Sequence, residues 1–134
     1  MIISALRDQP LPVYGDGLNV RDWIHVEDHC AAIVAALFKG KPGKIYNVGG
    51  DGEMPNLEVV KLILDTLGKP HSLISFVTDR LGHDRRYAID SSFAQRELEW
   101  RPLHNAREGI ATTIDWYVNH SSWWEALLDR AGRY

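Results

Sequence analysis

The stretch PVYGDGLNVRDWIHVEDHCAAIVAALF, residues 12–38, decides the fold. Its first four residues are typical of a short strand, and the Asp-Gly pair that follows favours a turn. A second strand is predicted over residues 20–26, because an acidic pair bounds it. Asp28 is suited to cap a helix over residues 29–38, where alanines favour helix. Strand, turn, strand and helix in this order predict an α/β fold.

Strands and helices continue along the chain until it becomes helical. One strand is predicted over residues 44–48, before a glycine-rich break, and another over residues 73–77. Asn56 is suited to cap a helix in which leucine and valine recur every three or four residues up to Leu67. Three further helices are predicted: one opened by residues 90–92 and ending near Leu98, one over residues 105–119, and one capped by Ser121 and Ser122. The predicted fold class is a mixed α+β lobe with a helical C-terminal third, in one domain over residues 1–134.

Composition excludes several classes of protein. The chain has 134 residues, enough for one domain, and its 45% apolar and 25% charged residues are ordinary for a globular protein. A net charge of −3 argues against a nucleic-acid binder, which needs a basic face to neutralise phosphates. A single cysteine makes no internal disulfide, the longest apolar run (residues 30–38) is too short to span a membrane, and the N-terminal residues lack the pattern of a signal peptide. We therefore expect a cytoplasmic protein with no nucleic-acid or membrane partner.

Two motifs of NAD-dependent dehydrogenases are missing. The glycines at 15 and 17 would need a third at position 20, and those at 50 and 52 a third at position 55, but valine and proline stand there. No G-x-G-x-x-G fingerprint is therefore present. No tyrosine is followed by a lysine four residues later, so the Tyr-x-x-x-Lys pair of short-chain dehydrogenase chemistry is missing too.

The stretch DRLGHDRR, residues 79–86, is the strongest candidate for a binding site. It places a glycine, a histidine and three arginines in a loop between a strand and a helix. Arginine forks suit phosphate oxygens, and loops on a rigid scaffold often bind ligands. The alternative is a solvated loop with surface ion pairs. Arg21 could clamp a diphosphate together with Arg80, or it could be an ordinary surface or ion-paired arginine.

A metal site is a weaker candidate. His25, Glu27, Asp28 and His29 are residue types that bind metals. A strand period of two, however, puts positions 25 and 27 on one face while position 29 starts a helix, so these side chains need not converge.

Several other residues are explained most simply by structure. Asn56 is most simply a helix cap, and Cys30, on an alanine-rich helix, is most simply a core residue. The aromatic residues near the C-terminus are expected to pack rather than to stack on bases, because the chain is acidic. They are Trp116, Tyr117, Trp123 and Trp124.

Together, these segments resemble a known family. PLPVYGDG (10–17), RDWIHVEDH (21–29), YNVGG (46–50), DRLGHDRRYAID (79–90) and ELEWRP (97–102) resemble the C-terminal part of the dTDP-glucose 4,6-dehydratases, in order and at that family's spacing. Those enzymes belong to the extended short-chain dehydrogenases that modify sugar nucleotides. The resemblance implies the C-terminal sugar-nucleotide-binding domain of such an enzyme, lacking most of the Rossmann domain.

The resemblance also implies which residues bind substrate: Pro12, Val13, Tyr14, Arg21, Asn56, Arg80 and His83. The first three match the strand that lies along the thymine and deoxyribose, and the two arginines match the pair that holds the diphosphate. The asparagine matches one that contacts the nucleotide at a helix start, and the histidine matches one near the sugar of the nucleotide. The family commonly has proline where Leu81 stands, and often tyrosine in place of His25.

The function implied is that of a part of an enzyme. The parent enzyme converts dTDP-glucose to dTDP-4-keto-6-deoxyglucose with NAD, which its N-terminal lobe binds. We therefore expect this chain to bind dTDP-glucose or dTDP, to hold no cofactor itself and to have no dehydratase activity alone. Its protein partner would be the missing Rossmann lobe or a second copy. The alternatives are a stand-alone nucleotide-sugar-binding or interaction module, and a metal protein that uses His25 and His29.

Overall fold

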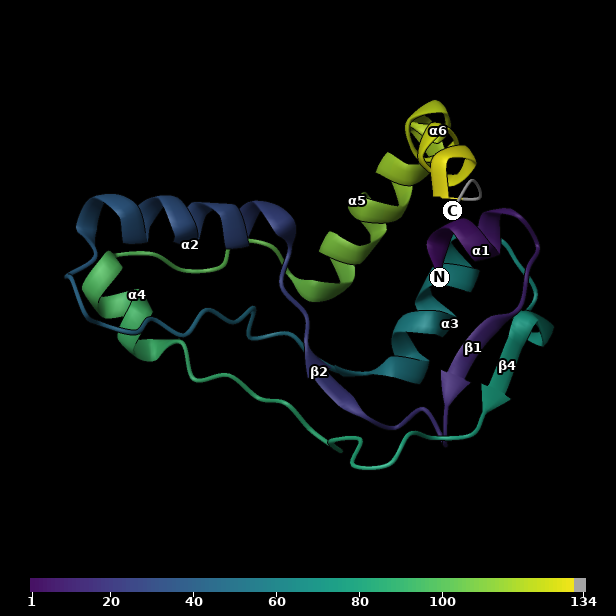
Figure 1. The fold of residues 1–134 in the computed structure, drawn as a ribbon, viewed down its shortest axis with the longest axis horizontal. Coiled ribbons are helices and arrows are strands. Elements are labelled where there is room, and N and C mark those ends of the chain that lie inside the picture. The colour runs from purple at the N-terminus through teal and green to yellow at the C-terminus, as the bar shows by residue number, and fades with distance from the viewer. Residues whose placement is uncertain (132–134) are drawn as a thin grey trace.

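A computed structural model describes residues 1–131. In chain order the elements are α1 (Ile2–Leu6), β1 (Leu11–Tyr14), β2 (Val20–Asp22), α2 (Val26–Lys39), β3 (Glu53–Pro55), α3 (Asn56–Thr66), the 3₁₀ turn η1 (His71–Leu73), β4 (Ile74–Val77), α4 (Ser92–Leu98), α5 (Ala106–Asn119) and α6 (Ser121–Ala131). Figure 1 shows two groups joined through β2: α2 with α4 on one side, and β1, β4, α1, α3 and α5 on the other. The mixed α+β class is confirmed.

Two small sheets organise the chain. Strand β1 pairs with β4 in parallel, from Leu11 opposite Ile74 to Tyr14 opposite Val77. Strand β2 pairs with β3 in antiparallel fashion, from Val20 opposite Pro55 to Asp22 opposite Glu53. The parallel β1–β4 pair therefore sets the loop after β4 beside the turn that leaves β1.

The main core lies between β1, α3 and α5. It buries apolar side chains of these elements and of α1 and β3: Ala5, Leu11, Val13, Met54, Val59, Val60, Ile63, Leu64 and Ile114. A second, smaller core joins α2 to α4 through Ala32, Ala94, Leu98 and Trp100. Figure 1 shows this second core's helices away from the rest of the chain, so α2 is covered on one side only.

Helix α2 begins three residues earlier than predicted, and Asp28 is not its cap. His25 is the N-cap, and its Nδ1 accepts from the Glu27 N–H at 3.3 Å. The Asp28 carboxylate is buried instead and accepts the backbone N–H groups of Leu103 (3.1 Å) and His104 (3.0 Å). Burial pulls the pKa of Asp28 upward, but these hydrogen bonds outweigh it and hold the pKa below its ordinary value of 3.8. Asp28 therefore fixes the chain before α5 to the start of α2.

The strand predicted over residues 44–48 is wrong. The segment pairs with no strand among residues 1–131, and its Ile45 side chain is 84% exposed. Tyr46 and Val48 pack against the second core. A strand forms only when a neighbour accepts its backbone hydrogen bonds, and the described part of the chain offers none here.

The ends of several other strands and helices differ from the predicted ones, because a local sequence pattern does not show which distant residues will pair. The strand predicted over 20–26 ends at Asp22, where its pairing with β3 ends. Pro55, not Asn56, is the N-cap of α3, and Asn56 is the first helical residue. Neither α1 nor β3 was predicted from the sequence. The helix predicted over residues 105–119 is present as α5, and Asn105 is its N-cap rather than its first residue, with a side chain that accepts from the Arg107 N–H.

The glycine run after residue 48 wraps around Asp22. The Asp22 carboxylate accepts the backbone N–H groups of Gly50 (3.1 Å) and Gly52 (2.9 Å). A Cβ at Gly50 would lie 2.2 Å from the Trp23 carbonyl oxygen, so no larger residue fits there without a shift. Asp22 thus holds the chain between β2 and β3 in place.

No helix within residues 1–131 is both long and apolar enough to cross a membrane.

Asp28→Asn should lower the free energy of unfolding by about 1–3 kcal/mol, because it weakens two hydrogen bonds to a buried carboxylate. The pKa of Asp28 is lower in the folded chain than in the unfolded chain. Its contribution is therefore present above the unfolded value and is lost as the pH falls through the folded pKa. Urea unfolding at about pH 7 and about pH 3 measures both effects.

Asp115→Asn, at an exposed carboxylate of α5, is the matched control. The wild type and this control should lose more stability between the two pH values than Asp28→Asn. Equal losses in all three proteins would contradict the role of Asp28.

Candidate functional site

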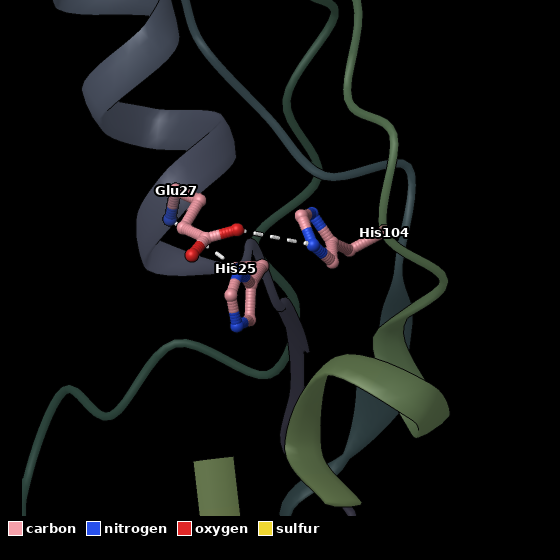
Figure 2. A group of neighbouring side chains, drawn as sticks. All are labelled: His25, Glu27 and His104. Atoms are coloured by element: carbon pink, nitrogen blue, oxygen red, sulfur yellow. Dashed lines mark hydrogen bonds and ion pairs between the residues drawn. The ribbon is translucent and has the colours of Figure 1, made fainter. Parts of the chain in front are cut away.

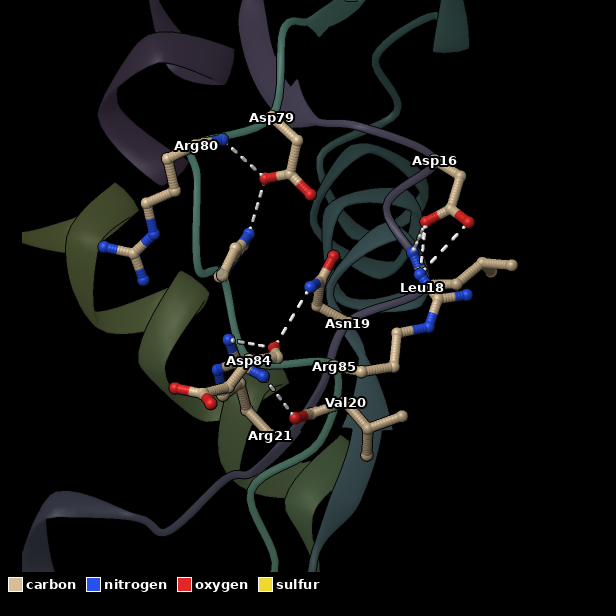
Figure 3. Close-up of polar contacts among 10 residues, drawn as sticks. Asp16, Leu18, Asn19, Val20, Arg21, Asp79, Arg80, Asp84 and Arg85 are labelled. Atoms are coloured by element: carbon tan, nitrogen blue, oxygen red, sulfur yellow. Dashed lines mark hydrogen bonds and ion pairs between the residues drawn. The ribbon is translucent and has the colours of Figure 1, made fainter.

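The segment from Gly17 to Asp22 holds the candidate site together. On one side, the Val20 N–H donates to the Arg85 carbonyl (2.8 Å), and the Tyr87 N–H donates to the Val20 carbonyl (3.0 Å). On the other side, the Asn19 carbonyl accepts the Asn56 N–H at 3.0 Å. The arginine-containing loop and the start of α3 are thus fixed to the same short piece of chain (Figure 3).

Arg21 is held against the loop that carries Arg80. Its Nη1 donates to the Val20 carbonyl (2.6 Å), and its Nη2 donates to the Asp84 carbonyl (3.0 Å). The guanidinium also lies 4.6 Å from the centroid of the Tyr87 ring. All these partners are backbone carbonyls or a ring, so the positive charge of Arg21 is oriented but not neutralised.

The next two arginines of the loop are paired with carboxylates. Arg85 lies 2.8 Å from Asp16, and Arg86 donates two hydrogen bonds to Glu53. Hydrogen bonds from these arginines hold the pKa of Asp16 and of Glu53 below their ordinary values. Both arginines therefore serve to fix the loop to the turn after β1 and to β3.

Arg80 differs from these paired arginines. Its backbone N–H donates to the Asp79 carboxylate, and Figure 3 shows its guanidinium pointing away from Asp16 and Arg85. Among the residues that the structure describes, neither Arg80 nor Arg21 forms an ion pair. The positive charges of Arg21 and Arg80 are therefore available to an anionic ligand.

Tyr87 lies near both of these cations. The hydrogen bond that its hydroxyl donates to the Asp84 carboxylate raises the pKa of Tyr87, and the charges of Arg21 and Arg80 oppose this rise. The two guanidinium groups therefore lie close enough to the same phenol for their fields to be felt there. An anion near the Tyr87 ring would be attracted by both guanidinium groups.

His83 joins the loop to β1. Its Nδ1 donates to the Asp79 carboxylate at 2.6 Å, and this hydrogen bond holds the pKa of Asp79 below its ordinary value. The ring lies edge-on to Tyr14, with centroids 6.0 Å apart. His83 and Tyr14, predicted from distant parts of the sequence, are thus neighbours.

The remaining predicted residues lie around this group. Pro12 is exposed on β1, whereas the Val13 side chain is buried in the main core and does not face solvent. Asn56 is half-buried at the first position of α3, bonded through its N–H to Asn19.

Asn19 is a residue of this site that the sequence reasoning missed. Its side chain is 2% exposed, and its Nδ2 donates to the Asp84 carbonyl at 3.1 Å, the same oxygen that accepts from Arg21. Asn19 therefore sets the position of both the loop and Arg21. Its place between two strand-like stretches gave no sign of burial, because only the fold brings Asp84 to it.

The metal-type residues meet in a different set from the one predicted. His25, Glu27 and His104 each offer a ligand atom within 4.8 Å of the others, and His29 is not in this group (Figure 2). The His25 and His104 rings stack with centroids 4.1 Å apart. His104 lies 3.4 Å from Glu27 and 3.0 Å from Asp28. His25 already caps α2, and His104 lies on the segment whose backbone is bonded to the Asp28 carboxylate, so these residues also have structural roles.

The fold and this loop are those of a sugar-nucleotide-modifying extended short-chain dehydrogenase, in its C-terminal part. The chain belongs to the family described as GDP-mannose 4,6 dehydratase, which residues 1–113 match.

Relatives with high sequence identity to this chain are named dTDP-glucose 4,6-dehydratases. One from Xanthomonas campestris is 50% identical over 99% of this chain and 40% of its own length. The NAD-bound structure from Bacillus anthracis is 48% identical with a TM-score of 0.86, covering 94% of this chain and 40% of that one. The structure from Streptomyces venezuelae, also with NAD bound, is 43% identical with a TM-score of 0.88, covering 94% of this chain and 39% of that one. The chain thus spans about 40% of the length of the curated relatives it matches.

Asn19→Leu should release the loop, because leucine cannot donate to the Asp84 carbonyl. We expect the free energy of unfolding to fall by about 1–3 kcal/mol, and amide exchange at Tyr87 to become faster than in the wild type. Asn119→Leu, at an exposed position of α5, should change stability by no more than about 0.5 kcal/mol. Unchanged exchange at Tyr87 in Asn19→Leu would contradict the positioning role.

Proposed function

We propose that this chain is the dTDP-sugar-binding portion of a dTDP-glucose 4,6-dehydratase. The observation that carries this proposal is the pair of cations, Arg21 and Arg80, left without carboxylate partners beside two arginines that have them. The proposed ligand is dTDP-glucose or dTDP. The residues proposed to contact it are Pro12, Val13, Tyr14, Arg21, Asn56, Arg80 and His83.

The charge of the ligand fits this arrangement. A diphosphate carries negative oxygens that two guanidinium forks bind through charge-assisted hydrogen bonds. Asn56 begins α3, and the N-terminus of a helix also favours an anion. Tyr14, beside His83 and exposed on β1, is proposed to lie along the base and deoxyribose.

We expect no catalysis by the chain alone. In the parent reaction, NAD oxidises C4 of the sugar, water is eliminated across C5 and C6, and the hydride returns to C6. NAD is the cofactor bound in the related structures. This chain carries neither the glycine fingerprint nor the Tyr-x-x-x-Lys pair, so we place NAD binding and catalysis in the part of the parent enzyme that it does not span.

The chain is proposed to be one nucleotide-sugar-binding lobe over residues 1–134, of which 132–134 lie outside the described residues. Its proposed protein partner is the missing Rossmann lobe or, failing that, a second copy. We expect a cytoplasmic location and no nucleic-acid or membrane partner, in keeping with the net charge of −3 and the single cysteine. The alternative function is a binding or interaction module that acts without any catalytic half.

Calorimetric titration with dTDP tests the site. The wild type should bind, and the double variant Arg21→Ala, Arg80→Ala should lose about 100-fold or more in affinity, because each guanidinium contributes charge-assisted hydrogen bonds. The control double variant Arg96→Ala, Arg101→Ala removes the same charge from two exposed arginines elsewhere. It should bind like the wild type. If both double variants lost dTDP affinity equally, the effect would follow from net charge alone, and the assignment of Arg21 and Arg80 to the binding site would be wrong.

An activity assay tests the absence of catalysis. The isolated chain, supplied with NAD and dTDP-glucose, should form no 4-keto-6-deoxy product above the rate without protein. NAD-dependent turnover that follows the chain through purification would refute this expectation.

A further inference from the structure

Three side chains of types that bind metals meet where α2 begins. His25 and Glu27 belong to the start of α2, and His104 lies just before α5; together they form the His–Glu–His cluster (Figure 2). Each offers a ligand atom within 4.8 Å of the others, and His104 Nε2 lies 3.4 Å from Glu27 Oε2. Ligands held ~2.1 Å from a tetrahedral zinc ion stand ~3.4 Å from one another. Two of the three ligands are therefore already at the separation that a shared ion requires.

The third ligand is His25, whose ring stacks on that of His104 with centroids 4.1 Å apart. Its Nδ1 accepts from the Glu27 N–H at 3.3 Å, which is longer than the ~3.0 Å of a well-formed hydrogen bond. The Glu27 side chain is mostly exposed. Rotation of these side chains, with the backbone in place, is enough to close the remaining distance.

Asp28 is placed to orient His104. Its carboxylate lies 3.0 Å from His104 Nδ1, but the two atoms are not aligned as a hydrogen bond, and this buried nitrogen has no hydrogen-bond partner among the described residues. Buried polar atoms are normally satisfied. A histidine that binds a metal through one nitrogen usually donates its other N–H to a carboxylate or a carbonyl. A metal ion on Nε2 would leave the proton on Nδ1, beside the Asp28 carboxylate.

The local charge favours a divalent cation. Within residues 1–131, Glu27 and Asp28 form ion pairs with His104 but with no lysine or arginine. The N-terminus of α2 opposes a cation with roughly half a positive charge. The two carboxylates carry a full negative charge each, so attraction outweighs this repulsion.

A cavity of about 810 Å³ adjoins the cluster, and the three residues form part of its wall. Much of the remaining wall is apolar, with Trp23, Val59, Ile63, Ile110 and Trp116 among its side chains. Gly109 of α5 leaves room for the rings, since a Cβ there would lie 3.3 Å from His25 Cδ2. Three protein ligands leave one position of a tetrahedral ion for water or another small ligand.

We propose that His25, Glu27 and His104 bind one zinc-type divalent ion, with Asp28 orienting the His104 ring. Two imidazoles and one carboxylate suit Zn²⁺ or Co²⁺ better than Mg²⁺ or Ca²⁺, which prefer oxygen ligands. The ion joins the start of α2 to the segment before α5. None of these residues belongs to the proposed nucleotide site, so the inference does not rest on dTDP binding.

Titration of the metal-free chain with Co²⁺ tests this site. Cobalt takes the same types of ligand as zinc, and its visible absorption reports its coordination. One equivalent per chain should give the absorption of a tetrahedral ion. Zn²⁺ should remove that absorption, whereas Mg²⁺ in excess should not. In the zinc-bound chain, the imidazole nitrogen resonances of His25 and His104 should shift, while those of His29 should stay in place.

A matched pair of double variants locates the ion. Glu27→Gln, His104→Gln removes two ligands and should weaken Co²⁺ binding about 100-fold or more. His29→Gln, Glu125→Gln makes the same changes at exposed positions outside the cluster and should bind Co²⁺ like the wild type. Circular dichroism verifies that both variants fold.

Three results would overturn the proposal. One is a folded wild-type chain that gives no tetrahedral cobalt absorption. Another is an equal loss of affinity in both double variants. The third is a sulfur-to-cobalt charge-transfer band, which would assign the ion to Cys30, the only cysteine of the chain. No readout involves dTDP, so a failure of nucleotide binding and a failure of metal binding are separate results.

Discussion

The structure depends on the hydrogen bonds made by one short strand, β2, and the residues before it. Val20 bonds through both its N–H and its carbonyl to the loop at residues 85–87, and it stands opposite Pro55 in β3. The Asp22 side chain of the same strand holds the glycine turn before β3. The arginine loop and the start of α3 are far apart in sequence. They lie side by side because both are hydrogen-bonded to the backbone of residues 19 and 20. Without it, Arg21, His83 and Asn56 would have no common frame.

Charge pairing then divides the arginines of the site by role. Arg85 and Arg86 pair with carboxylates and anchor the loop. The Arg21 guanidinium is oriented by carbonyl oxygens, and Arg80 is bonded only through its backbone N–H, to Asp79. The Arg21 guanidinium is held in place but not neutralised, so it loses less conformational entropy when an anion binds. An acidic chain can thus present a local positive site without an overall basic surface.

The sequence predicts features that depend on neighbouring residues, and it misses contacts between residues that are far apart in the chain. The helix ending at Asn119, the helix starting at Ser92 and the strand ending at Val77 depend on neighbours in sequence, and their predictions agree with the structure within a residue or two. Residues 44–48 have strand composition but find no strand to pair with among residues 1–131, so the prediction fails. Asn19 and the contact between His25 and His104 depend on chain separations that no pattern reveals. The site residues came from a family resemblance, whereas their division into paired and free arginines came only from the structure.

The most direct test of this account follows the arginine side chains by NMR while dTDP is added to the folded chain. The Nε–H resonances of Arg21 and Arg80 should shift in a saturable way, while those of Arg85 and Arg86, which keep their carboxylate partners, should move little. Shifts confined to Arg85 and Arg86, or no shift at any of the four in a folded chain, would contradict the claim that the free pair forms the diphosphate site.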